Sequence, residues 1–147
     1  ELAMACTFRV MQENAKIGLT ELNLGIIPGW GGTQRMPRIL GKSKALDLIL
    51  FSKRISAQEA LAIGLVERVT KEEDLLKEVM EMATILAKRP PLAVKAVLNA
   101  VMGGLYEGFA EGDRLEALGS NEVAKSSDAV EGFTAFMQKR EPEFKGV

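Results

Sequence analysis

The most informative absence in this 147-residue sequence is histidine, which does not occur at all. From its own residues, the chain therefore cannot build a histidine metal site or a nucleophile paired with histidine. Its single cysteine, Cys6, cannot form a disulfide within the chain. The apolar neighbours of Cys6 predict a packing role, because free cysteine is among the most buried residue types. Acid–base chemistry is left to carboxylates, and no metal site is expected.

Long apolar runs and an excess of one charge are also missing. No uninterrupted apolar stretch approaches the ~20 residues that a membrane-spanning helix requires, so we expect no membrane anchor. The 19 basic residues are balanced by 20 acidic ones, which leaves no overall positive field to attract nucleic acid. Only two short basic stretches, residues 53–58 and 139–145, are candidates for such contact, and we expect no nucleic-acid partner.

What is present is the composition of an ordinary globular protein, with 47% apolar and 27% charged residues. A chain of this length can bury roughly 68–70% of its unfolded surface, and no repeat or linker divides it. We therefore expect one domain in two parts. Residues 1–70 mix short strands with helices, and residues 71–147 are helical.

The first part has the patterns of short elements. Alternation predicts strands at 7–11, 15–19 and 65–69, and apolar spacing predicts helices at 1–6, 32–40 and 43–51. Ser56 and Glu59 form a capping-box pattern that predicts another helix, ended by Gly64.

The second part shows helical spacing throughout. A capping box at Thr70–Glu73 predicts a helix that runs to Pro90, and Pro91 can begin the next helix, which Gly103 and Gly104 are expected to loosen. Two further helices are predicted at 109–124 and 127–137.

Two acids and a glycine-rich turn carry the functional signal. Glu1 and Glu21 both have apolar neighbours, and residues 24–35, LGIIPGWGGTQR, hold four glycines. Two carboxylates on one cleft could act as acid and base for the addition of water. By spacing alone, however, Glu1 fits an exposed first-turn residue and Glu21 an ordinary turn acid. The glycines either let the backbone approach a ligand or only permit a positive φ.

Residues 1–6, 15–69 and 129–146 resemble, in order, the crotonase superfamily, and most of all its enoyl-CoA hydratases. The central block matches the family pattern G-x-x-E-x-x-x-G-x-x-P-G-x-G-G-T-Q-R, with Trp30 at a position that is often alanine. The matching residues are Gly18, Glu21, Gly25, Pro28, Gly29, Gly31, Gly32, Thr33, Gln34 and Arg35. The resemblance implies an α/β crotonase-like spiral fold, of which this chain holds the last core turns and a helical C-terminal region that makes trimer contacts.

The resemblance also implies an activity, the reversible addition of water to a 2-trans-enoyl-CoA. Glu1 and Glu21 match the two catalytic glutamates, which hold one water, and Gly29 matches a position whose backbone N–H faces water and substrate. Family isomerases typically keep only the second acid, so the presence of both favours a hydratase. An isomerase or another acyl-CoA enzyme of the superfamily is the alternative within the enzyme class, and a non-catalytic oligomerisation or RNA-binding module is the alternative outside it.

Further implications concern binding and context. Lys139 matches a position that contacts the CoA phosphates, although it also fits a solvated lysine in a charged tail. Many relatives have an aromatic residue near Ser120, and this sequence has none there. The oxyanion hole lies upstream of the position matching Glu1, so we expect this chain alone to be inactive. No cofactor is implied, since CoA is part of the substrate. We expect a homo-oligomer, a trimer or a dimer of trimers, that serves fatty-acid β-oxidation in the cytoplasm, or in the mitochondrial matrix of a eukaryote.

Overall fold

The computed structural model describes all residues from Glu1 to Val147. Its contacts divide the chain into two compact units, Glu1–Glu81 and Met82–Val147. The division falls inside helix α5 (Leu75–Ala87). That both parts belong to one domain, with a change of character at residue 70, stays a prediction.

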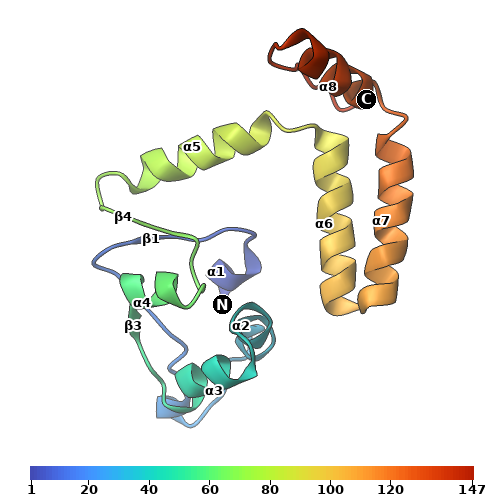
Figure 1. The fold of residues 1–147 in the computed structure, drawn as a ribbon. Coiled ribbons are helices and arrows are strands. Elements are labelled where there is room, and N and C mark those ends of the chain that lie inside the picture. Colours follow the sequence, from blue (N-terminus) through green and yellow to red (C-terminus); the bar gives the residue numbers. More distant parts are fainter. The chain divides into compact units, whose positions relative to one another are not determined.

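The first unit is built from short elements (Figure 1). They are α1 (Leu2–Ala5), β1 (Val10–Gln12), β2 (Lys16–Ile17), the 3-10 helix η1 (Glu21–Leu24), α2 (Gly32–Leu40), α3 (Lys42–Leu50), β3 (Ile55–Ser56), α4 (Ala57–Ala62), β4 (Arg68–Thr70) and the start of α5. The predicted helices at 1–6, 32–40 and 43–51 are therefore present. Strand β3 and helix η1 were not predicted.

Two small sheets join segments of this unit that are distant in the sequence. β1 pairs in parallel with β4, with Met11 opposite Val69, and β2 pairs antiparallel with β3, with Ile17 opposite Ile55. The helices between β2 and β4 complete one apolar core, which contains Met4, Met11, Leu19, Met36, Ala45, Leu48, Ile49, Ile55, Ala57, Ala60, Leu65 and Val66. This core positions the N-terminal segment and the glycine-rich turn.

The capping box at Ser56 is confirmed. Ser56 Oγ accepts a hydrogen bond from the N–H of Glu59, and the Glu59 carboxylate accepts one from the N–H of Ser56 at 2.8 Å. This backbone hydrogen bond, together with one from the Ser56 hydroxyl, lowers the pKa of Glu59 below its usual value. Helix α4 follows, and Gly64 adopts a left-handed φ of 78° shortly after its end.

Two local predictions in this unit are wrong. Thr70 does not cap a helix, because it pairs with Gln12 at the end of β4 and its carbonyl accepts a hydrogen bond from Glu13 N at 2.8 Å. Helix α5 begins only at Leu75. Cys6 is exposed rather than packed, because it lies just after the short helix α1 and no other part of the chain covers it.

The second unit contains the rest of α5, then α6 (Pro91–Tyr106), α7 (Phe109–Val123) and α8 (Ser127–Gln138). Helices α6 and α7 lie side by side (Figure 1). Gly103 and Gly104 do not loosen α6, which continues through them. A Cβ at Gly112 on α7 would lie 2.7 Å from Gly104 Cα. These glycines therefore allow close helix–helix contact, and the predicted loosening is wrong.

Candidate active site

The carboxylate of Glu1 is bound to the glycine-rich turn. Its Oε1 accepts hydrogen bonds from the backbone N–H of Trp30 at 2.8 Å and from that of Gly32 at 2.7 Å. Glu1 precedes α1 and makes no side-chain capping bond to that helix. Hydrogen bonds to a charged acceptor are about twice as strong as neutral ones. Glu1 is therefore not simply an exposed first-turn residue, because two residues distant in the sequence fix one of its oxygens.

Two glycines in the turn have structural reasons. Gly31 has a left-handed φ of 97° and is the N-cap of α2, a conformation that favours glycine. Gly32 is buried, and a Cβ there would lie 2.9 Å from both Glu1 Oε1 and Leu19 Cδ1. The positive φ expected from the sequence explains Gly31, whereas close approach to a carboxylate explains Gly32.

Neither a positive φ nor a close contact requires glycine at position 29. Its φ lies outside the left-handed region, and the nearest atom to a Cβ built there is Ile27 O at 3.9 Å. The N–H of Gly29 donates no hydrogen bond within the chain. Nothing in the chain itself therefore requires glycine at this position, and the backbone donor is available to a group from outside the chain.

Glu21 is the first residue of η1, and its backbone carbonyl accepts the N–H of Ile26 at 3.3 Å. Its side-chain oxygen Oε2 is buried, and no group of the chain donates a hydrogen bond to it. The large majority of buried polar side-chain atoms in proteins have a hydrogen-bond partner, and the exceptions include catalytic groups and groups that bind a water. The chain therefore leaves the hydrogen-bonding capacity of Glu21 Oε2 unmet.

Both acids belong to the first unit, and the segment that carries Glu21 approaches the same turn that binds Glu1. Leu19, two residues before Glu21, packs against Gly32 on the side where Glu1 also lies. The structure thus brings Glu1, the turn and Leu19 together. That the two carboxylates share one water stays a prediction.

Lys139 lies in the second unit, directly after α8. It is exposed and adopts a left-handed φ of 54°, which is uncommon for a residue other than glycine. Its N–H donates to Phe136 O at 3.2 Å, and the N–H of Arg140 donates to Ala135 O at 3.1 Å. This pattern closes the end of the helix and fixes the backbone at Lys139.

The C-terminal tail is held against α8 by two carboxylates. Asp128 is buried and accepts the N–H groups of Lys145 at 2.7 Å and Gly146 at 2.8 Å. Glu131 pairs with Arg140 through two hydrogen bonds of 2.6 and 2.8 Å. This pairing, with a further hydrogen bond from the N–H of Glu143, lowers the pKa of Glu131 to about 2.

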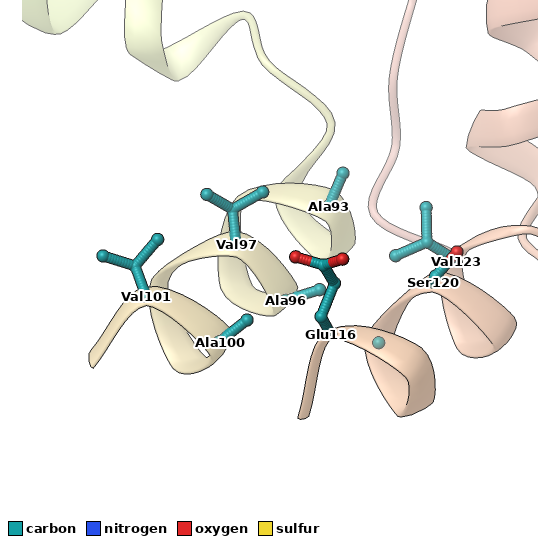
Figure 2. Close-up of a pocket in the computed structure, with 9 residues that line it drawn as sticks. Ala93, Ala96, Val97, Ala100, Val101, Glu116, Ser120 and Val123 are labelled. Atoms are coloured by element: carbon teal, nitrogen blue, oxygen red, sulfur yellow. The ribbon is translucent and has the colours of Figure 1, made fainter. Parts of the chain in front are cut away.

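A hollow between α6 and α7 (Figure 2) is less suited to acid–base chemistry than the surroundings of Glu1. Its walls are small and apolar side chains such as Ala96 and Val97, and Glu116 is its only charged residue. None of the predicted site residues lines it. The chain also has no group of three or more acidic or cysteine side chains placed to hold a metal ion, and no helix long and apolar enough to cross a membrane.

Comparison with known proteins identifies relatives along the whole chain. A family model described as enoyl-CoA hydratase/isomerase matches residues 1–147. A probable enoyl-CoA hydratase of Bacillus subtilis is 44% identical over 99% of this chain and 57% of its own length. The 2,3-dehydroadipyl-CoA hydratase of Escherichia coli is 41% identical, again over 99% of this chain and 57% of its own length.

Solved structures agree with these sequence matches. The crystal structure of an enoyl-CoA hydratase from Bacillus anthracis superposes with a TM-score of 0.95 and 42% identity, over 99% of this chain and 57% of that one. The predicted α/β fold is confirmed by this match. The chain spans about 57% of the length of these relatives.

Proposed function

The chain belongs to the enoyl-CoA hydratase/isomerase family, and we propose on this basis that it carries both catalytic acids of an enoyl-CoA hydratase, Glu1 and Glu21. The main support is the state of the two carboxylates. Glu1 Oε1 is fixed by two backbone N–H groups, and Glu21 Oε2 is buried without a donor from the chain. One acid is thus oriented, and the other has a buried oxygen whose hydrogen-bonding capacity the chain leaves unmet.

The proposed reaction adds water across the C2–C3 double bond of a 2-trans-enoyl-CoA. The water oxygen bonds to C3 while one carboxylate accepts a proton from the water, and C2 receives a proton from the other acid. Proton transfer is needed at two neighbouring carbons, so two carboxylates suit the reaction. General acid–base groups each contribute about 10² to 10⁴ in rate. Which of Glu1 and Glu21 accepts the proton and which donates it stays unassigned.

The substrate class follows from the same family. We propose that an acyl-CoA thioester binds with its reacting carbons near Gly29, whose N–H is available, and that Lys139 contacts the CoA phosphates. No cofactor is needed for this chemistry, since CoA belongs to the substrate. The oxyanion hole is expected upstream of Glu1, and losing one such donor costs about 10² to 10³ in kcat.

Assembly and cellular context are proposed from the exposed apolar surface and the family. Large apolar side chains remain exposed, including Phe109 (85%) and Phe136 (79%) in the second unit. Exposed apolar patches beyond a few hundred Å² are rare on monomers. We propose a homo-oligomer, a trimer or a dimer of trimers, working in fatty-acid β-oxidation in the cytoplasm or in a mitochondrial matrix.

The alternative within the family is an enoyl-CoA isomerase. A relative from Mycosarcoma maydis, 41% identical, carries the name enoyl-CoA isomerase/hydratase. Moving a double bond can be managed by a single mobile base, whereas hydration uses two acids. The anchoring of Glu1 in addition to Glu21 favours the hydratase.

The direct test is Glu21→Gln in the full-length protein, with hydration of crotonyl-CoA as the assay. We expect a loss of about 10² to 10⁴ in kcat, with thermal unfolding close to that of the wild type. Glu13→Gln is the matched control, because Glu13 is an exposed acid of the same unit, and it should keep full activity. Full activity in a folded Glu21→Gln variant would remove Glu21 from the mechanism.

A further inference from the structure

We propose that Arg35 is a positioning residue for Glu1. It holds the glycine-rich turn in the one conformation in which both N–H donors reach the carboxylate. The inference rests on the proposed function of Glu1. It assigns to Arg35 an effect on kcat that acts through the turn, without contact to the substrate.

Arg35 contacts the turn at two points. It lies in the first turn of α2, where its Nη1 donates to Trp30 O at 2.7 Å and its backbone N–H donates to Gly31 O at 2.8 Å. The guanidinium lies directly against Gly31, where a Cβ would overlap Nη1 and come within 2.8 Å of Cζ. Two features therefore require glycine at position 31, namely its φ of 97° and the guanidinium that covers it.

The carbonyl that Arg35 holds belongs to the residue whose N–H binds Glu1. Trp30 donates its N–H to Glu1 Oε1 at 2.8 Å and offers its carbonyl to Arg35. The next peptide leads through Gly31 to Gly32, the second donor to Glu1. Glycine reaches φ values of either sign at similar cost, so the Trp30–Gly31 peptide needs an outside contact to stay in one orientation. Arg35 is that contact. The Trp30–Gly31 peptide lies between the two peptides that carry the donors to Glu1, so a change in its orientation would displace these donors.

Arg35 differs from four other arginines of the chain in the kind of partner that it has. Four arginines of the chain, Arg9, Arg68, Arg114 and Arg140, pair with glutamates. Arg35 forms no ion pair, and its guanidinium donates to a backbone carbonyl. The guanidinium of Arg35 is half-buried and donates only to the Trp30 carbonyl. Its only partner is therefore the glycine-rich turn.

The consequence for catalysis is orientation. With Oε1 held by two donors, the other oxygen of Glu1 has no hydrogen bond within the chain and is available to the reacting water. Loss of Arg35 should therefore lower kcat and leave KM for the CoA substrate unchanged. A charge-assisted hydrogen bond of this kind corresponds to about 10- to 100-fold in rate.

The test uses Arg35→Ala in the full-length protein, with crotonyl-CoA hydration as the assay. We expect kcat to fall by about 10- to 100-fold with KM unchanged, and millimolar guanidinium to restore part of the loss. Arg38→Ala is the matched control, because Arg38 lies one turn later on α2 and bonds to Gln34 O at 2.9 Å. It should keep its kcat and show no response to guanidinium.

A second background separates positioning from a general loss of stability. In a Glu1→Gln protein, Arg35→Ala should lower kcat little further, because both changes act on the same carboxylate. If Arg35→Ala does not fold, Arg35→Gln takes its place with the same direction of change. Wild-type kcat in whichever variant folds, or an equal loss in the Glu1→Gln background, overturns the proposal. If Glu1→Gln itself keeps full activity, the proposed function fails instead.

Discussion

Replacing Glu1 by glutamine or by alanine should separate its structural role from its chemical one. Glutamine keeps an oxygen that can accept the N–H groups of Trp30 and Gly32, now 2.8 and 2.7 Å from Glu1 Oε1, but it cannot take up a proton. Alanine removes the acceptor altogether. Both variants therefore lose proton transfer, but only the glutamine variant still offers the N–H groups of the turn an acceptor.

The magnitudes follow from the hydrogen bonds. A bond to a charged group is worth about 1.5–3 kcal/mol and a neutral one about 0.5–1.5 kcal/mol, so the change to a neutral acceptor costs about 1–1.5 kcal/mol per bond. For the two bonds, Glu1→Gln should cost about 2–3 kcal/mol of unfolding free energy where they are dry, and about 1–2 kcal/mol at this partly buried site. Glu1→Ala leaves two donors without an acceptor at about 1–3 kcal/mol each where they stay dry. Because Glu1 and its surroundings are only partly buried, water can reach the donors and the total should stay near about 2–4 kcal/mol.

The assay pairs denaturant unfolding with crotonyl-CoA hydration in the full-length protein. Both variants should lose about 10² to 10⁴ in kcat, although their stabilities differ. If the activity of the two variants instead followed their stability, with Glu1→Gln close to the wild type, Glu1 would be a structural anchor and not an acid–base group.

Three further predictions concern other residues. Gly29→Ala should leave the melting temperature unchanged, since a Cβ there meets no atom closer than 3.9 Å, yet lower kcat/KM by about 10²-fold through misplacement of substrate; a variant with normal kinetics would contradict this. Lys139→Ala should raise KM for the CoA substrate by about 2- to 5-fold, as expected for an exposed charge, with kcat unchanged; kinetics with a substrate lacking the 3′-phosphate identify which phosphate is involved, and an unaltered KM argues for a merely solvated lysine. The pKa of Glu131 is lowered to about 2 from an ordinary 4.5, first by Arg140, so its stabilisation is full above about pH 4.5 and is lost as the pH falls toward 2; unfolding curves of wild type and Glu131→Gln should converge over this range, and parallel curves would refute the pairing.

Local signals were sufficient wherever neighbouring residues decide the structure. The Ser56–Glu59 capping box involves two side chains three residues apart, and both of its hydrogen bonds are present. The helices at 32–40 and 43–51 needed only apolar spacing and correspond to α2 and α3. The glycine-rich turn was recognisable because so many glycines in twelve residues need a reason beyond sequence composition.

Predictions failed where a distant partner decides. Thr70 has the residues of a capping box after it, but pairing with Gln12 takes it into a strand. Gly103 and Gly104 weaken a helix by propensity, whereas contacts with α7, of Gly103 with Leu115 and of Gly104 with Gly112, give them a packing function. Tertiary contacts override local preference in both cases, and a single sequence does not contain them.

The candidate site was also predictable only in part from the sequence. The sequence pattern selects Glu1 and Glu21 as acids, but only the structure shows that Glu1 is bound by Trp30 and Gly32. The contact of Arg35 with Trp30 O carries no sequence signal other than its place in the matching block. It depends on the left-handed turn at Gly31, which a pattern of residue types does not describe.

The most direct test of the account is the hydration rate of the Glu1→Gln/Glu21→Gln double variant, compared with both single variants. If the two acids act on one water, removing the second should add little to the loss caused by the first, because groups that work as a unit are strongly non-additive. The account predicts that the kcat of the double variant is lower than that of the wild type by a factor of about 10² to 10⁴ and close to that of the less active single variant. An undiminished rate, or a loss equal to the product of the two single losses, would contradict it.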